Sequence, residues 1–484
     1  MKKNAIKLAL PAIAMLLVST QAQATLKTDK VTLKGNMQVK YNKLPKAVDT
    51  FKEALSEGMF YGRFRTNFFY WDWAKENYKS GGKLKDNKNN GVGGSLIYKS
   101  APFKGVSATV GMYTSQNLEF FRMDKADVKY AKAGKDTFSR YNVATGGHYG
   151  MTVLGQAYLQ YDATKKTSIV AGRQMFETVF TKSNDTKMVP NTFDGVSVTS
   201  KDIPKTTVKL AYFVGQKLRD HTSRHDILAF DPNNKWNQND DSAVNKNLTV
   251  SRIGRDNKLF VASVTNKSIK HLKANVSYVR VPGVISNVTL EGHYTIPIGS
   301  LKIVPGVRYM MQFDDLNANY GVANLKTNET NYKDPNSLDS NLLCARIDFK
   351  QGGFLGRLGY SKVADKADIV APWRGFPTGG FTRAMAQYNW YANTKTYMIR
   401  AGYDFSKAKI LPGFSIMARY AIQDFDDTKP GVQADSNVFH MDLRQNIAGN
   451  SELKFRLGVV DAKSTNGKTD ISYNEYRLEY NYFF

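Results

Sequence analysis

A two-residue alternation of apolar and polar side chains recurs from about residue 59 to the C-terminus. In the first such segment, residues 59–71, the aromatic Phe60 and Phe64 fall on one face. Arg63 and Arg65 fall on the other face. Successive side chains of a strand point to opposite faces, so this period predicts β-strands rather than helices. The same alternation returns in residues 106–113, 207–215, 301–313, 396–405, 413–423, 452–460 and 473–484.

The connections between these segments alternate between short and long. The short ones are 101–105, 162–167, 202–206, 295–300, 351–353, 407–413 and 448–452. The long polar ones are 72–90, 115–149, 177–191, 217–257, 314–340, 364–395, 425–436 and 462–470. Outer-membrane barrels have short periplasmic turns and longer external loops, whereas a soluble sandwich has no reason to sort its loops by length. The pattern predicts an all-β, transmembrane, antiparallel up-and-down barrel.

The strand count follows from this alternation. We predict 18 strands with both ends of the barrel at the short-turn side, because an even number is usual in such barrels. Residues 384–393 also alternate, but a strand there would make the number odd, so we assign them to a long loop. Residues 59–484 are then the barrel, with strands long enough to cross a bilayer at about 9–11 residues each.

The N-terminus has a different composition. Residues 1–24 combine early lysines, the apolar stretch 8–18 and a small-residue cleavage site, Ala22–Ala24, which is typical of a secretory signal peptide. Residues 25–58 are predicted to form a periplasmic arm. Within it, residues 44–58 carry apolar side chains at helical spacing and favour a short helix, with a poorly ordered arm as the alternative.

The charge and cysteine content exclude several function classes. The formal net charge is +26, but the basic residues are scattered through strand-like segments rather than gathered in a block. With the export signal, this argues against nucleic acid as a partner. A single cysteine, Cys344, permits no internal disulfide and no cysteine metal cluster. The mean hydropathy of −0.43 fits a soluble periplasmic protein or a barrel, because alternating strands dilute hydropathy.

Arginines recur on the polar faces of the predicted strands. If apolar faces meet lipid, these arginines point into the lumen and gather on one side, since the first and last strands are neighbours. Guanidinium groups pair carboxylates bidentately, so such a strip would form a basic ladder for anions. The alternative is general lumen polarity balanced by Asp348, Asp404, Asp442 and Glu475. The ladder comprises Arg63, Arg65, Arg173, Arg308, Arg346, Arg357, Arg400, Arg419, Arg444, Arg456 and Arg477.

One long connection is unusually apolar. Residues 172–198 contain Phe176, Phe180 and Met188, which would anchor a loop that folds inward and narrows a pore. The alternative is a loop packed on the rim.

The same connection resembles the constriction loop of OprD-type substrate-specific outer-membrane porins. Residues 403–420 resemble a strand–turn–strand unit of that family, and "YNEYRLEYNYFF" is similar to its last strand. The resemblance implies an 18-stranded barrel with inward-folded loops that conducts small carboxylate-bearing or anionic solutes. Lys187 departs from the family's more usual Arg. The residues that match the loop signature are Ser183, Asn184, Asp185, Lys187, Pro190, Phe193 and Gly195.

The expected partners follow from that resemblance. They are outer-membrane lipid and lipopolysaccharide, small anionic solutes, and the barrel-insertion machinery through the terminal Phe484, in the outer membrane of a Gram-negative bacterium. The chain would be a monomer or a loose homotrimer, with no cofactor.

Two other functions stay open at this point. A barrel enzyme of the lipase or protease type would need a nucleophile beside an inward histidine such as His293 or His440, and neither has a clear partner in sequence. A soluble exported binding protein would need no lipid-facing band. His221 and His225 could pair on a metal, and residues 231–241 offer oxygen ligands, but both are better explained as parts of an external loop.

Overall fold

The structure is a computed structural model that describes residue 29 and residues 31–33, 37–132, 134–231, 245–325, 331–385, 388–429, 432–447, 449–462 and 468–484. The predicted signal peptide, residues 1–24, lies outside the described residues. Most of segment 231–241 lies outside them as well.

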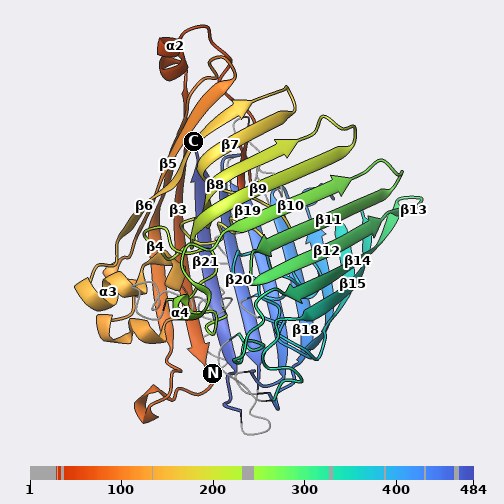
Figure 1. The fold of residues 1–484 in the computed structure, drawn as a ribbon. Helices are drawn as coiled ribbons and strands as arrows, with labels where there is room; N and C mark the ends of the chain where they lie inside the picture. Colours follow the sequence, from red (N-terminus) through yellow and green to blue (C-terminus); the bar gives the residue numbers. More distant parts are fainter. Residues whose placement is uncertain are drawn as a thin grey trace.

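A closed antiparallel barrel makes up most of the chain (Figure 1). Its first nine strands are β3 (Met59–Trp73), β4 (Asn87–Lys99), β5 (Val106–Gln116), β6 (Met151–Asp162), β7 (Thr167–Gln174), β8 (Thr192–Ser200), β9 (Thr206–Lys217), β10 (Leu259–Asn266) and β11 (Leu272–Val281). The others are β12 (Ile285–Tyr294), β13 (Ile296–Ile298), β14 (Leu301–Asp314), β15 (Ser340–Gln351), β16 (Phe354–Val363), β17 (Lys395–Asp404), β18 (Phe414–Asp424), β19 (Ser436–Ile447), β20 (Ser451–Asp461) and β21 (Tyr473–Phe483).

The barrel has 18 transmembrane strands, as predicted, because the short β13 continues β12 and both pair with β14. The last strand, β21, pairs with the first, β3, from Tyr473 opposite Trp73 to Phe483 opposite Arg63. This seam leaves no free sheet edge, which lipid would not tolerate. Residues 384 and 385 and residues 388–393 lie in a loop, so assigning the segment outside the wall is confirmed.

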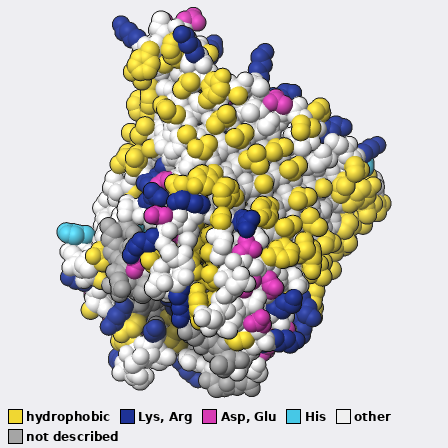
Figure 2. Space-filling model, in the orientation of Figure 1, with side chains coloured by type: hydrophobic (Ala, Val, Ile, Leu, Met, Phe, Trp, Pro, Cys, Tyr) yellow, Lys and Arg dark blue, Asp and Glu magenta, His cyan; other side chains and the backbone are white. Residues whose placement is uncertain are grey.

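The alternation seen in sequence sorts side chains between lipid and lumen. Phe60, Val276 and Ile399 are among the exposed apolar residues on the outer face, and Figure 2 shows such side chains spread over the outer wall. Residues at the intervening positions, for example Arg65 and Asn67, are buried inside the barrel. Because side chains alternate, each strand presents apolar side chains to lipid and polar side chains to the lumen.

The long connections lie at one end of the barrel and the tight turns at the other. The exception is the β11–β12 connection, where residues 282–284 form a tight turn at the long-loop end. The expectation of long external loops therefore fails at this one hairpin. Three-residue loops join antiparallel strands without strain, so nothing in the wall itself demands a long loop there.

The long loops also hold short helices. They are η1 (Tyr78–Ser80), η2 (Glu119–Phe121), η3 (Lys125–Tyr130), η4 (Lys135–Thr137), α3 (Arg140–Gly146) and α4 (Val250–Ile253). Among the described residues, no helix is long and apolar enough to cross a membrane.

The N-terminal arm carries a two-stranded hairpin, β1 (Val31–Leu33) with β2 (Val39–Tyr41), and the helix α2 (Phe51–Ser56). Thr50 and Glu53 form a capping box that starts α2 at Phe51, seven residues after the start of the predicted segment 44–58. Val31, Leu33 and Met37 are buried against Phe483 at the short-turn mouth. Arg63 donates to the carbonyl oxygen of Met37 (3.3 Å), so part of the arm lies inside the mouth.

Candidate functional site

The connection between β7 and β8, residues 175–191, folds into the barrel and reaches the opposite wall; we call it the constriction loop. Asp185 accepts a hydrogen bond from Arg65 (2.6 Å) and forms an ion pair with Arg63, both on β3. Asn67, also on β3, donates to the carbonyl oxygen of Lys187 (2.6 Å). All of these side chains are buried. A buried carboxylate held by two guanidinium groups is a charge-assisted anchor that fixes the loop in place.

The other predicted loop residues help to hold this shape. The hydroxyl and backbone N–H of Ser183 both donate to Glu177, at 2.5 and 2.7 Å. Asn184 adopts a left-handed conformation with φ of 43°, which asparagine tolerates better than most residues. The carbonyl oxygen of Pro190 accepts from Lys217 (3.5 Å). The predicted apolar anchors Phe176, Phe180 and Met188 are buried, as an inward loop requires.

A second long connection, residues 364–394, also enters the barrel and pairs with the constriction loop; we call it the partner loop. The backbone N–H of Lys182 donates to Trp373 (3.0 Å), and that of Gly375 donates to Phe180 (2.8 Å). The indole of Trp373 donates to the carbonyl oxygen of Ile227 (2.9 Å), and the whole side chain is buried. The two loops therefore form one folded unit inside the lumen.

Two polar cavities lie on either side of this unit. The first, about 660 Å³, is lined by residues of the long loops and by Arg419, Arg456 and Arg477. The second, about 520 Å³, is lined by Lys209, Lys273, Arg308 and their neighbours. Asn184 and Phe376, one from each loop, line both cavities. We call the place where the two cavities meet, at these two residues, the eyelet.

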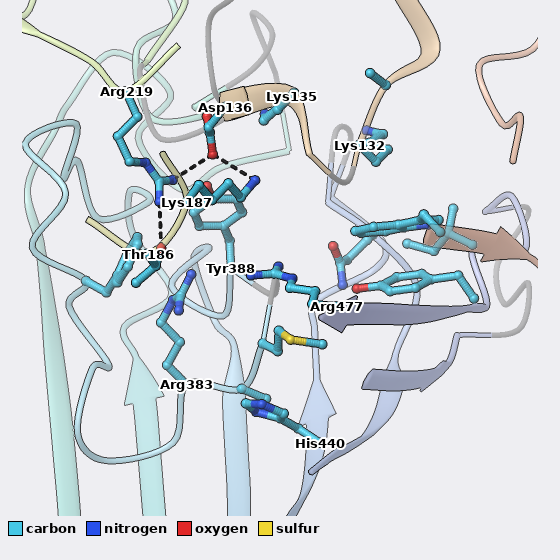
Figure 3. A pocket seen from close by; sticks show the side chains of 18 of the residues that line it. Lys132, Lys135, Asp136, Thr186, Lys187, Arg219, Arg383, Tyr388, His440 and Arg477 are labelled. Carbon is cyan, nitrogen blue, oxygen red and sulfur yellow. Dashed lines mark hydrogen bonds and ion pairs between the residues drawn. The ribbon is translucent and has the colours of Figure 1, made fainter. Parts of the chain in front are cut away.

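A buried charge cluster fixes the long-loop side of the eyelet (Figure 3). Asp136 forms ion pairs with Lys187 (2.8 Å) and Arg219 (3.1 Å), and Arg219 also donates to the hydroxyl of Thr186 (3.0 Å). Burial lowers the pKa of Lys187 to about 8, although the Asp136 carboxylate opposes the shift and Arg477 and Arg219 add to it. The ammonium group therefore loses its proton within an ordinary range of buffer pH.

The barrel register places ten of the eleven predicted ladder arginines on one arc of the lumen wall, formed by β14–β21 and β3. Arg357 is directly opposite Arg400, and Arg400 is directly opposite Arg419. Arg456 is likewise opposite Arg477 on the next strands. Strands β4–β12 carry two arginines, Arg173 and Arg280, and neither points into the lumen. The arginines thus line one half of the wall.

Most of these arginines already have a carboxylate partner. The pairs are Arg63 and Arg65 with Asp185, Arg308 with Glu291, Arg346 and Arg357 with Asp348, Arg444 with Glu452, Arg456 with Asp442, and Arg477 with Glu475. Asp404, which we expected to balance the lumen arginines, forms an ion pair with Lys407 instead.

Arg400 and Arg419 differ from the rest of the ladder. Among the described residues, neither forms an ion pair with a carboxylate, and the one hydrogen bond of Arg419 goes to the carbonyl oxygen of Arg383 (2.7 Å). On the four neighbouring strands β16 to β19, the residues opposite one another are, in order, Arg357, Arg400, Arg419 and His440. Asp442 acts on both guanidinium groups, and Asp348 on Arg400, from a distance. This adjacent couple therefore differs from the rest of the ladder in lacking a direct contact with a carboxylate.

Arg173 does not belong to the ladder. It is opposite Ala157 on β6 and Asp194 on β8, on the same face as the exposed Leu159 and Val196. It therefore lies on the outer face and forms a bidentate ion pair with Asp194 (2.7 and 2.8 Å). The lumen assignment was wrong because both faces of β7 are weakly polar and only the pairing register decides between them.

Several residues of the eyelet were missed in the sequence. Arg383 lies over the ring of Phe376 at 3.5 Å, Asp136 joins two loops, and Arg219 bonds the constriction loop. They belong to loops without a regular period, so no alternation could point to them. Trp71 and Trp73 end strand β3, and their ring contacts with Tyr473 in the lining of the first cavity also could not be predicted from the sequence.

The histidines weighed as catalytic or metal-binding candidates lie in two places, the lumen wall and a long loop. His440 and His293 point inward, and each bonds the carboxylate two residues away, Asp442 and Glu291, at 2.7 Å. The rings of His221 and His225 lie 4.4 Å apart. Within the part of the chain that the structure describes, no group of three or more His, Cys, Asp or Glu side chains could hold a metal ion.

Comparison with known proteins assigns this arrangement to a family. The family model described as outer membrane porin, OprD family, matches residues 163–484. The chain belongs to the OprD family of outer-membrane porins. This porin is thus a substrate-specific channel of the outer membrane that sits in lipid and passes small solutes. No curated protein matches the chain.

Solved structures share the barrel at low sequence identity. Acinetobacter baumannii OccAB3 matches with a TM-score of 0.67 and 16% identity over 89% of this porin and 100% of that chain. Pseudomonas aeruginosa OpdK, solved with vanillate, gives 0.66 and 14% over 89% and 99%. Pseudomonas aeruginosa OccK8 (OprE) gives 0.67 and 14% over 89% and 99%. These likenesses show the fold.

Proposed function

We propose that this porin favours small solutes with a carboxylate or another anionic group, and that Arg400 and Arg419 form their principal binding step. The observation that carries the proposal is the lack of a carboxylate partner for this register-paired couple, set among arginines that have one. A solute carboxylate would supply the missing countercharge.

The chemistry of the couple suits a channel. The planar guanidinium group pairs a carboxylate through two parallel hydrogen bonds, which selects carboxylates over less directional anions. Conduction also requires that the solute leave. Arg357 on one side and Arg456 on the other are already occupied by Asp348 and Asp442, so they offer weaker sites to which the anion can step.

The alternative is that acids and arginines simply make a polar lumen without ion preference. It accounts for the paired members of the ladder, but not for two adjacent arginines without acids. The vanillate in the OpdK structure is consistent with carboxylate recognition in a similar barrel. The aromatic pair Trp71 and Tyr473, stacked at 3.9 Å, offers an apolar surface beside Arg477 on the way to the couple.

Planar-bilayer recording tests the proposal. Purified porin is measured across a potassium chloride gradient, with small carboxylates added on one side and the matching amides as controls. We expect a reversal potential on the anion side and block of the current by carboxylates but not by amides. A reversal potential near zero, with equal effects of acid and amide, would reject the ladder and leave an unselective channel.

We further propose that the exported chain meets lipopolysaccharide on its outer face and the barrel-insertion machinery through Phe484, as a monomer or a loose homotrimer without enzymatic activity. Phe484 supports the second contact, because its ring is half exposed on the outer face. The ring lies over Gly62, where a Cβ would meet it at 1.9 Å, so only glycine leaves room for it. Esterase and protease assays on folded protein test for catalysis.

A further inference from the structure

The periplasmic end of the porin carries an exposed apolar surface that the solute pathway does not use. Phe51 and Leu55 lie one turn apart on α2 and are 67% and 54% exposed. Residues four apart lie on one face of a helix, so Phe51 and Leu55 project together. We call Phe51 and Leu55 the rim patch.

The helix is fixed to the barrel through its opposite side. Ala54 is the buried residue of α2, and its carbonyl oxygen accepts from the backbone N–H of Ala101 (2.9 Å) in the β4–β5 turn. The N–H of Val48 donates to Pro102 in the same turn (2.9 Å). An isolated helix of this length is unstable in water, so these bonds and the capping box hold it. The rim patch is therefore presented in a set direction.

That direction follows from Tyr98 on β4. Tyr98 is opposite the exposed Phe60, and their ring centroids are 5.0 Å apart, so both rings lie on the lipid-facing side of the wall. The hydroxyl of Tyr98 donates to the carbonyl oxygen of Leu55 (2.5 Å). A Cβ on Gly58 would meet this hydroxyl at 2.3 Å, so the chain passes directly over it. The end of α2 thus sits above the lipid-facing surface.

We propose that α2 is an interfacial anchor whose rim patch inserts into the periplasmic leaflet of the outer membrane, among phospholipid acyl chains. The apolar side chains of the barrel wall continue to the end of the molecule where α2 lies (Figure 2). Side chains of this size in water would leave a large apolar area hydrated, whereas burial in the acyl boundary removes it. Phospholipid already covers Phe60 in this orientation, so the patch extends an existing lipid contact.

The charges around the patch specify the kind of lipid. Residues 43–57 carry three lysines, Lys43, Lys46 and Lys52, and three acids, Asp49, Glu53 and Glu57. The segment is therefore neutral. It should bind zwitterionic phospholipid through apolar contact and show little dependence on anionic lipid or salt, unlike a basic membrane-binding helix.

Spin-label accessibility tests the proposal in full-length folded porin. The buried Cys344 is replaced in a C344S background, and single variants Leu55→Cys, Phe60→Cys and Lys52→Cys each receive a nitroxide. Lys52 is the matched control on the same helix, and Phe60 is the lipid-facing control. Each is reconstituted in zwitterionic phospholipid bilayers, with heat-modifiable migration as the check on folding. Collision with oxygen, which concentrates in acyl chains, is compared with collision with a water-soluble nickel chelate.

We expect the oxygen-to-nickel ratio at Leu55 to resemble that at Phe60 and to exceed that at Lys52 several-fold. The ratio at Leu55 should not change when a third of the lipid is made anionic. A ratio equal to that at Lys52 would place the patch in water and overturn the proposal. Low collision with both reagents would mean that protein covers the patch, a second copy of the chain included, and would overturn it as well.

Discussion

The two halves of the barrel wall carry the same outer face but different lumen faces. Strands β4–β12 present serines, threonines and asparagines inward, as where Ser263 and Ser277 share a hydrogen bond of 2.8 Å. Strands β14–β21 and β3 present the arginines. Lipid imposes one requirement on every strand, so the outer faces are alike. The lumen is under no such requirement, and there the halves differ in charge.

Because of this difference, an anion would pass along one side of the lumen rather than through its centre. An anion in the lumen is attracted to the arginine half, and the two inward loops limit how far it can move from that wall. Asp185 ties the constriction loop to β3 through Arg63 and Arg65, and the loop itself starts from β7 in the half without lumen arginines. The loop therefore joins the two halves at the eyelet.

Reversing the charge of the couple should have the largest effect on this contrast. In Arg400→Glu with Arg419→Glu, we expect the anion-to-cation permeability ratio to fall several-fold, because two unpaired cations become acids beside the paired arginines. Reversal potentials in a salt gradient measure it. The matched double reversal on the half without lumen arginines, Lys209→Glu with Lys273→Glu, should cause a smaller fall. Equal falls would show that net charge matters and the arginine wall does not.

Removing the link between the halves should have the next largest effect. Deletion of Thr181–Val189 takes away the loop segment that crosses the lumen, and we expect single-channel conductance to roughly double or more as the narrowest section widens. A conductance that stays at the wild-type level would place the eyelet elsewhere.

A milder version of the same test is Asp185→Ala. It leaves Arg63 and Arg65 buried without their carboxylate, a change that costs about 3–5 kcal/mol in a typical buried pair. We expect a lower free energy of unfolding in urea and noisier single-channel currents. Asp202→Ala, in an exposed turn, is the control and should leave both measurements nearly unchanged.

The pH dependence at the eyelet should be a moderate effect. Lys187, which faces Asp136, Arg219 and Arg477, has a pKa lowered to about 8, so it is charged below this pH and neutral above it. Anion preference should therefore weaken as the pH rises from about 7 to 9. Lys187→Arg keeps the charge and should remove the change. A wild-type preference that is flat over this range would contradict the assignment.

The smallest effect is expected from Arg173→Gln. Because Arg173 lies on the outer face, its neutralisation should leave the reversal potential at the wild-type value. Arg400→Gln, the same substitution on the lumen side, should shift it. If Arg173→Gln also lowers anion preference, the field of outward charges reaches the pathway and the contrast between the halves is less sharp than the register indicates.

The barrel wall could be predicted from the order of the residues alone. Alternation located the strands and assigned their two faces, because the pleat of a strand admits only one period. The apolar composition of residues 172–198 also pointed to an inward-folded loop, because exposing Phe176, Phe180 and Met188 to water is unfavourable. Loop lengths predicted which end of the barrel carries the long connections. The exception is residues 282–284, a tight turn at the long-loop end that joins its two strands equally well.

Which charged side chains are paired with an opposite charge depends on the three-dimensional arrangement of the strands and loops. Arg173 could be assigned to the outer face only from its pairing with Ala157 and Asp194. Both faces of β7 are weakly polar, so the alternation does not show which of them meets lipid. The anchor of Asp185 joins residues more than a hundred positions apart, at Arg63 and Arg65. That Arg400 and Arg419 lack a direct carboxylate contact emerged from the positions of the acids among the described residues. Coulomb attraction depends on distance in space, and a sequence fixes that distance only within a single strand.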